Sequence, residues 1–346
     1  MIRVLIAEDS VTVRELLREI LLGGEDMTLV GEARNGLEAI DLTKALRPDL
    51  VVMDIGMPKM DGFEASRQIM IEAPTPIVIV SASYDVRDVE VSMHALRAGA
   101  LTAIPKPPGP LAPQFEEDAR QFLDTLRLMS QVKVVRRWAD KPPTPRPPII
   151  ERTSMRPRVV AIAASTGGPA AVQQIITDLP ADFPVAILLV QHISRGFVEG
   201  FAAWLNTAGP LRVRVASDGE PLRPGTVYIA PDDHHIGVAD RSRIALASTP
   251  PINRFRPSAN HLFASIADQF GSAAVAVVLT GMGDDGCEGL AAIRREGGRI
   301  VAQDEKTSVV FGMPGAAIQA GLADWTLPIQ EIAPTLRSLV VAQENA

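Results

Sequence analysis

Short apolar stretches rich in Val, Ile and Leu alternate along this chain with stretches whose apolar residues recur at helical spacing. Strands that are separated by helices pair in parallel, and the helices cover both faces of the sheet. The alternation repeats five times over residues 1–130, which predicts a doubly wound parallel sheet in the strand order 2-1-3-4-5. The expected strands are Arg3 to Ala7, Thr28 to Ala33, Leu50 to Met53, Ile77 to Val80 and Leu101 to Ile104.

Polar side chains follow four of these five strands. Glu8 and Asp9 follow the first strand, Asp54 the third, Ser81 the fourth and Lys106 the fifth. Each alone would be read as a loop or capping residue, but the carboxyl ends of parallel strands share one edge of the sheet. Three carboxylates with a hydroxyl and an ammonium suit Mg²⁺ and a phosphoryl group, with Ser81 and Lys106 binding phosphoryl oxygens.

The second half contains an apolar run, Val159 to Ala164, that stops at Ser165 and two glycines. The run is typical of a strand buried on both faces, and apolar residues at helical spacing follow it. Ser165 is therefore expected on a strand-to-helix turn, where free amides of the helix point forward. This stretch alone leaves two interpretations open: a nucleophile beside an oxyanion site, or a glycine-rich turn that closes the unit or binds phosphate.

Two later strands favour the nucleophile. The run Val185 to Val190 ends at Gln191 and His192, and the run Ala274 to Leu279 is followed by a glycine-rich loop that contains Asp285. In a mainly parallel sheet these strand ends lie on the edge that carries Ser165. A Ser, a His and an Asp at equivalent places predict a hydrolytic triad.

The length and the proline distribution indicate two domains. A chain of 346 residues is long enough for two cores. Residues 131–157 contain a cluster of prolines, which predicts an extended linker, either a passive tether or a spacer that lets the domains dock and separate. We expect domains at 1–130 and 158–346, the second with a Rossmann-like α/β fold.

Composition excludes several classes of protein. No apolar run approaches the roughly 20 residues that span a bilayer, and no signal peptide precedes the first strand, so we expect a cytoplasmic protein without direct membrane insertion. A net charge of -7 argues against nucleic acid as the main partner. Cys287 is the single cysteine, which excludes intrachain disulfides and cysteine-based zinc sites.

Two further pairs of residues lie near the predicted hydrolytic residues in the sequence of the second domain. Arg254 and Arg256 place two cations on a loop before a helix, which fits an acidic substrate, although pairing with local carboxylates is an open alternative. His234 and His235 are adjacent, so on a strand they face opposite ways; we expect them at the rim or surface rather than in a metal site.

The N-terminal motifs carry a family resemblance. The acidic pair Glu8-Asp9, the segment Asp54 to Gly62, Ser81-Ala82-Ser83 and Lys106-Pro107 make residues 1 to about 125 similar to a response-regulator receiver domain. The resemblance implies that Asp54 is the phosphoacceptor and that Lys106-Pro107 is a cis bond. It implies that Mg²⁺ is bound by Glu8, Asp9, Asp54 and the backbone carbonyl of Gly56.

The C-terminal motifs resemble the catalytic domain of the chemotaxis protein-glutamate methylesterases. The matching segments are Ala164 to Pro169, Gln191-His192, Tyr228 to Pro231, Asn253 to Ser258, Leu279 to Gly286 and Phe311 to Pro314. The resemblance implies that Ser165 is the nucleophile, His192 the general base and acid, and Asp285 the orienting carboxylate. It also implies backbone oxyanion donors at Thr166 and Met282.

Together the two resemblances predict a phosphorylation-regulated serine hydrolase. It would demethylate glutamate methyl esters on chemoreceptors, and deamidate glutamines, without a cofactor for hydrolysis. A sensor histidine kinase would be the phosphodonor in a two-component pathway. The alternative is a non-enzymatic phospho-switch whose second domain binds a nucleotide at the Gly167-Gly168 turn; such a site would need neither His192 nor Asp285.

Overall fold

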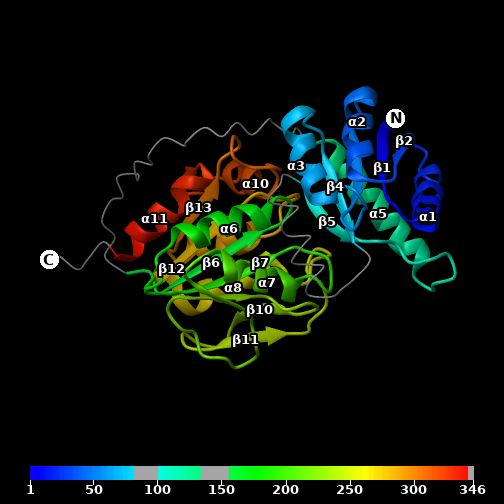
Figure 1. Cartoon of the computed structure of the whole chain (residues 1–346). Helices are drawn as coiled ribbons and strands as arrows, with labels where there is room; N and C mark the ends of the chain where they lie inside the picture. Colours follow the sequence, from blue (N-terminus) through cyan, green and yellow to red (C-terminus); the bar gives the residue numbers. More distant parts are fainter. Residues whose placement is uncertain (82–99, 133, 135–155, 342–346) are drawn as a thin grey trace. The chain divides into compact units, whose positions relative to one another are not determined.

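The computed structural model describes residues 1–81, 100–132, 134 and 156–341 (Figure 1). The chain divides into two compact units, Met1–Asp140 and Lys141–Ala346, each with its own sheet. The alternation of strands and helices predicts a helix at about residues 86–98, before the fifth strand. That segment and most of the proline-rich linker lie outside the described residues, so both stay predictions. None of the described helices is long and apolar enough to cross a membrane.

The first unit is built on a five-stranded parallel sheet. Its order is β2-β1-β3-β4-β5, as the sequence predicts. The strands are β1 (Ile2–Ala7), β2 (Met27–Ala33), β3 (Leu50–Asp54), β4 (Ile77–Ser81) and β5 (Thr102–Pro105). The chain adds β2 on one side of β1 and then β3, β4 and β5 on the other side. The residues that follow β1 and β3 therefore flank the switch point, where α/β sheets bind ligands.

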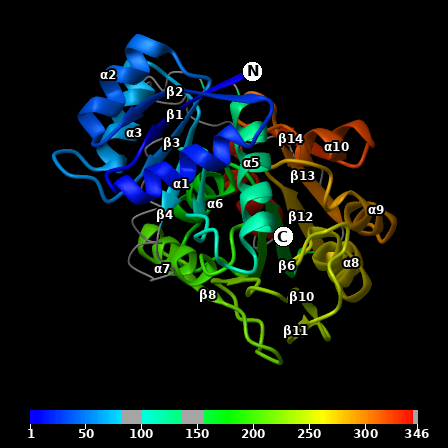
Figure 2. The same ribbon diagram turned by 90° about the vertical axis from the view of Figure 1, so that its right-hand side faces the viewer.

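Helices cover both faces of this sheet. Figure 2 shows α2 and α3 on one face and α1 and α5 on the other. Ser10, Asn35 and Asp61 cap the first three helices, because each side chain accepts a hydrogen bond from an amide of the first turn. The described helices are α1 (Val11–Leu22), α2 (Gly36–Leu46), α3 (Gly62–Glu72) and α5 (Phe115–Ser130).

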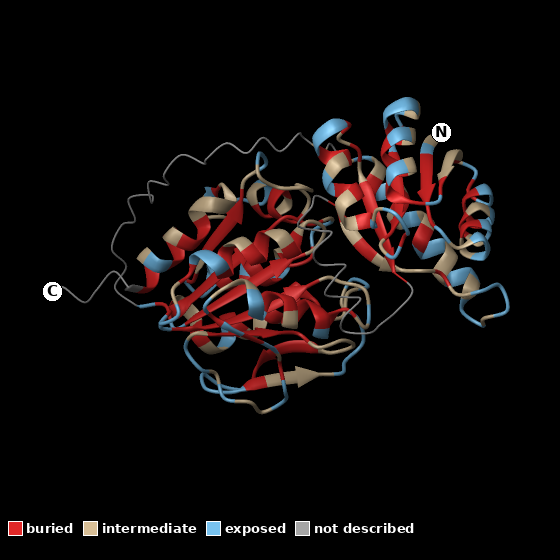
Figure 3. Cartoon of the chain, viewed as in Figure 1, coloured by how far each residue is buried: buried red, intermediate tan, exposed pale blue. Residues whose placement is uncertain are grey.

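The second unit contains a seven-stranded sheet in which every pair is parallel. Its order is β14-β13-β12-β6-β7-β9-β8. The strands are β6 (Val159–Ala164), β7 (Ala186–Gln191), β8 (Arg212–Val215), β9 (Thr226–Ile229), β12 (Ala274–Val278), β13 (Arg299–Gln303) and β14 (Trp325–Leu327). Every residue of β6, β7 and β12 is buried, as expected for strands covered on both faces (Figure 3).

The alternating side chains of β6 show how this sheet is covered. Val159, Ala161 and Ala163 pack with apolar residues of α8 and α9 into one core. On the opposite face lie α6, α7 and α11 (Figure 1). The helices are α6 (Gly168–Asp178), α7 (Val198–Ala208), α8 (Ala259–Phe270), α9 (Cys287–Arg295), α10 (Met313–Gln319) and α11 (Ile329–Val341).

A two-stranded antiparallel ribbon, β10 (His235–Val238) and β11 (Ile244–Ala247), packs outside the main sheet. The place of His235 in this ribbon differs from the prediction of a rim or surface position. His235 is fully buried and stacks on His261 of α8, with ring centroids 4.9 Å apart. The alternation of a strand fixes which residues face opposite ways, and here α8 covers the face that carries His235.

The Lys106–Pro107 peptide bond is trans, not cis as the resemblance implied; among the described residues the cis bond is Arg256–Pro257. An X–Pro bond adopts the cis form only where its surroundings offset the preference for trans.

Candidate functional site

Ser165 lies directly beyond β6, at the switch point of the second sheet. β6 pairs with β12 on one side and with β7 on the other. The chain turns sharply after Ser165: Gly167 has a φ of +77°, and a Cβ atom there would lie 2.5 Å from the Cβ of Val309. A Cβ on Gly281 would lie 2.7 Å from the Ser165 Cβ. Both glycines are therefore required by close packing around the candidate nucleophile.

His192 occupies the equivalent position beyond β7. Its amide donates to Ala164 O at 2.9 Å, which places the His192 backbone beside Ser165. Its Nε2 atom lies 3.0 Å from Asp285 Oδ2. No hydrogen bond joins the Ser165 hydroxyl to His192 among the described residues, a common state of catalytic pairs without substrate.

Asp285 is almost completely buried, and the N-terminus of α8 surrounds its carboxylate. It accepts hydrogen bonds from Ser258 Oγ at 2.8 Å, Ala259 N at 2.7 Å and Asn260 N at 3.2 Å. Burial alone would raise the pKa of Asp285, but the hydrogen bonds from His192, Ala259 and Ser258 outweigh it and hold the pKa below its usual value. The neighbouring Asp284 is exposed. Of the two carboxylates in this loop, Asp285 is thus the ionised partner of His192.

The expected oxyanion donors lie on two adjacent turns. Neither the Thr166 amide nor the Met282 amide donates a hydrogen bond to an acceptor among the described residues. Thr280 holds the two turns together, because its Oγ1 donates to Thr166 O at 2.9 Å and accepts from Val310 N at 2.9 Å. Two free amides beside Ser165 suit an oxyanion.

Sequence reasoning missed two side chains of this site. Gln191 ends β7, and its amide nitrogen donates to Ser165 O at 2.8 Å and to His192 O at 2.9 Å. Phe255 stacks on the His192 ring. A polar residue that ends an otherwise apolar buried strand was a usable signal for Gln191, but no periodicity marks Phe255, which lies in an irregular loop.

The two candidate substrate arginines have different surroundings. Arg256 donates to Thr249 O at 3.3 Å and lies 3.6 Å from Asp233 Oδ1. Asp233 is also paired with Arg195 at 2.8 Å. Arg254 is exposed at the tip of its turn. The alternative of local pairing therefore describes Arg256, and Arg254 is the cation that is presented to solvent.

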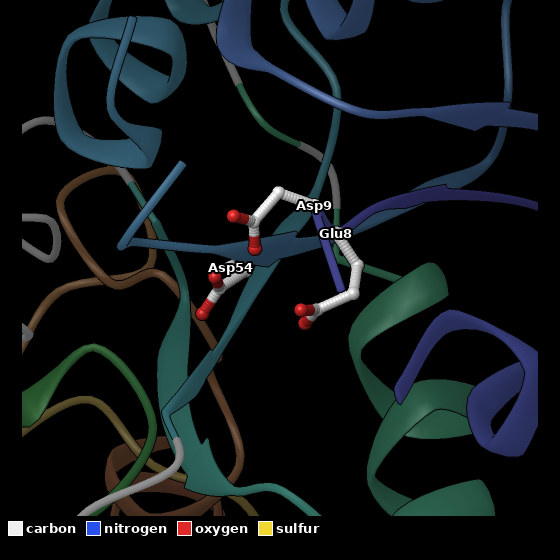
Figure 4. A group of neighbouring side chains, drawn as sticks. All are labelled: Glu8, Asp9 and Asp54. Carbon is white, nitrogen blue, oxygen red and sulfur yellow. The ribbon is translucent and has the colours of Figure 1, made fainter. Parts of the chain in front are cut away.

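In the first unit, three carboxylates gather beyond β1 and β3. One oxygen each of Glu8, Asp9 and Asp54 lies within 4.8 Å of the others (Figure 4). Lys106 Nζ lies 2.7 Å from Glu8 Oε2 and 3.0 Å from Asp54 Oδ1. Ser81 ends β4, and its carbonyl accepts from Lys106 N at 2.9 Å. The structure thus brings all five residues to one edge of the sheet.

The electrostatics of this cluster suit a divalent cation. Burial, opposed by Lys106 and reinforced by the Asp54 charge, raises the pKa of Glu8 above its usual value. Burial alone would lower the pKa of Lys106, but Glu8 and Asp54 raise it above its usual value. Three carboxylates facing one ammonium leave an excess of negative charge that hard oxygen-binding ions such as Mg²⁺ neutralise. The donor set fits that ion.

Comparisons with known proteins identify a family for each of the two units. The family model described as CheB methylesterase matches residues 160–336, and the response regulator receiver domain model matches residues 4–111. A "Protein-glutamate methylesterase/protein-glutamine glutaminase 4" of Myxococcus xanthus is 54% identical over 341 residues, which cover 97% of this chain and 96% of the relative. A relative with the same activities in its name, from Anaeromyxobacter dehalogenans, is 52% identical over 97% of this chain and 98% of its own length.

A solved structure resembles the second unit. The crystal structure of the Thermotoga maritima CheB methylesterase catalytic domain superposes with a TM-score of 0.53 at 40% identity. The match covers 54% of this chain and 100% of that domain.

Proposed function

The chain belongs to the CheB methylesterase family, and from that premise we propose that Ser165, His192 and Asp285 hydrolyse glutamate methyl esters on chemoreceptors. The observation that carries the proposal is the contact of His192 with the buried Asp285 beside the Ser165 turn. The same chemistry releases ammonia from a glutamine side chain, so the chain also deamidates. A nucleotide-binding switch is not favoured, because it would leave the His192–Asp285 pair without a use.

Hydrolysis proceeds in two acyl-transfer steps. His192 takes the proton of the Ser165 hydroxyl as its oxygen attacks the ester carbonyl, and the amides of Thr166 and Met282 stabilise the oxyanion. Asp285 stabilises the imidazolium. His192 returns the proton to the departing methoxide, which leaves as methanol. Water, activated by the same His192, then attacks the acyl-enzyme and releases free glutamate.

The arginines at the rim recognise an acidic protein surface. Arg254 is exposed and pairs with a carboxylate of the substrate. Arg256 is paired with Asp233, and its remaining N–H groups donate hydrogen bonds to the substrate. Exposed charges of this kind raise the rate of encounter more than the affinity, and salt weakens their effect.

The first unit receives a phosphoryl group on Asp54. Glu8, Asp9, Asp54 and the Gly56 carbonyl would hold Mg²⁺, which would supply positive charge against the phosphoryl oxygens. Ser81 donates a hydrogen bond to one phosphoryl oxygen, and Lys106 pairs with another. A sensor histidine kinase supplies the phosphoryl group, and phosphorylation raises the esterase activity of the second unit.

Methanol release from methyl-labelled receptor membranes tests this function. The wild-type chain should release methanol, and acetyl phosphate should accelerate the release. Asp54→Ala should keep the basal rate and lose the response, whereas Ser165→Ala should lose both the release and labelling by a fluorophosphonate probe. A Ser165→Ala protein with wild-type release would refute the proposed nucleophile.

A further inference from the structure

The imidazole of His192 lies flat against the ring of Phe255. The ring centroids are 4.3 Å apart, and the planes are inclined by 8°. A two-residue turn presents Phe255, since its amide donates to Ile252 O at 2.8 Å and Ile252 N donates to Phe255 O at 3.0 Å. The two residues between them, Asn253 and Arg254, have φ values of 48° and 72°, as in the tight turns of hairpins. A hydrogen-bonded loop therefore holds the aromatic ring in place.

The two ring nitrogens of His192 have different surroundings. Nε2 lies 3.0 Å from Asp285 Oδ2, and an ionised carboxylate can only accept a hydrogen bond, so Nε2 carries the proton. Nδ1 then keeps its lone pair. It is buried and has no hydrogen-bond partner within the described part of the chain.

The order of the strands explains this arrangement. β6, which carries Ser165, lies between β7, which carries His192, and β12, which precedes Asp285. Neighbouring strands are about 4.8 Å apart, so His192 has Ser165 beside it and the Asp285 loop about two strands away. Nδ1 is the ring nitrogen closer to the backbone, and Nε2 is the outer one. The outer nitrogen reaches the distant carboxylate, and the inner nitrogen remains for the adjacent serine.

We propose that His192 acts on Ser165 through Nδ1, and that Phe255 is the positioning residue that holds the imidazole plane in line between Ser165 and Asp285. This inference rests on the hydrolase function proposed above. In chymotrypsin-type serine proteases the assignment is the reverse: Nε2 of the histidine faces the serine and Nδ1 faces the aspartate.

The reaction gives Phe255 a second effect. When the Ser165 oxygen forms its bond to the ester carbon, its proton moves to Nδ1, and the ring becomes an imidazolium with protons on both nitrogens. That cation lies between the Asp285 carboxylate and the face of Phe255, and an aromatic face attracts a cation. The proton later leaves Nδ1 with the methoxide, and the neutral ring is restored.

Nitrogen NMR of the full chain tests the assignment without substrate. The sequence has five histidines, so ¹⁵N-histidine labelling gives few signals. The two signals that disappear in His192→Gln belong to the two ring nitrogens of His192. We expect the neutral His192 ring to carry its proton on Nε2. A proton on Nδ1 would overturn the assignment even if the chain proves to be an active esterase. Absent methanol release with the proton on Nε2 would count against the function alone.

Three variants test the role of Phe255. Phe255→Leu keeps an apolar side chain without an aromatic face, and should lower kcat about tenfold with little change in KM. Phe255→Tyr and Phe255→Trp keep the face and should restore most of kcat. In Phe255→Leu the two nitrogen shifts should also move toward each other, because the tautomer is less strictly held. A Leu variant with wild-type kcat and nitrogen shifts, or Tyr and Trp variants as slow as Leu, would refute the positioning role.

Discussion

Asn260 and Asp285 cap each other's helices. The Asn260 amide, at the start of α8, donates to Asp285 Oδ1 at 3.2 Å. In return Asn260 Oδ1 accepts from Gly286 N at 3.1 Å and from Gly289 N at 3.0 Å, at the start of α9. Amides at the N-termini of α8 and α9, which have no partner within their own helices, thus each find a side-chain acceptor on the other segment. The carboxylate that orients His192 is therefore part of the folded core, and changes to it should affect both stability and activity.

The first prediction concerns Asp285→Asn. Four donors converge on this carboxylate, and an amide can accept at only one of its two ends, so at least one buried donor loses its partner. We expect a loss of about 1–3 kcal/mol in the free energy of unfolding, together with a large drop in kcat. Urea unfolding and methanol release measure the two effects. Asp284→Asn, at the exposed neighbour, is the matched control and should change neither; equal effects of the two substitutions would contradict the assignment.

The second prediction concerns Gln191, whose amide ties the carbonyls of Ser165 and His192 together. Gln191→Glu keeps the shape but places a buried acceptor against two carbonyl oxygens. We expect a fall in kcat of at least about tenfold and a loss of about 1–3 kcal/mol of stability. Gln191→Met removes the donor without adding an acceptor, and should fall between the wild type and Glu. Wild-type kcat in the Met variant would show that these bonds do not position the pair.

The fold could be predicted largely because its strands are short, apolar and buried on both faces. The runs that became β6, β7 and β12 stand out by composition alone, and the rule that parallel strands end at one edge then brings Ser165, His192 and Asp285 together. The same rule predicts that Glu8, Asp54 and Lys106 lie together in the first unit.

The parts that could not be predicted depend on irregular loops and on helix placement. The stacking of Phe255 follows from a turn with positive φ values, which leaves no periodic pattern. The burial of His235 follows from the position of α8, and its Nδ1 accepts from Ser258 N at 3.1 Å, one residue before that helix. Pairing of Arg256 with Asp233 joins two loops that are separate in the sequence.

The third prediction is a pH dependence of stability from His261. Burial, and then the nearby His235, hold the pKa of His261 below its usual value of 6.5. Below pH 6.5 the unfolded chain therefore binds more protons at this site than the folded chain, so stability falls as the pH drops through that window. Urea unfolding at about pH 7.5 and about pH 5.5 measures the loss. His261→Gln should reduce the difference between the two pH values, and an unchanged difference would exclude His261 as a contributor.

The last prediction separates the metal from the hydrolysis. Lys106 is paired with Glu8 and Asp54, whereas Asp9 is exposed, so the Asp9 carboxylate supplies negative charge that Lys106 does not offset. We expect Asp9→Asn to weaken Mg²⁺ binding at least about tenfold, or about 1.4 kcal/mol. Calorimetric titration with Mg²⁺ measures this directly, and the rise in Tm that Mg²⁺ causes should shrink in the variant. Asp41→Asn, which changes an exposed acid on α2, is the control and should bind Mg²⁺ as the wild type does.

Phosphorylation by acetyl phosphate should fail in EDTA, while basal methanol release should persist, because the triad uses only protons and hydrogen bonds. Loss of basal release in EDTA would mean that a metal takes part in ester hydrolysis, and the triad mechanism would have to be replaced.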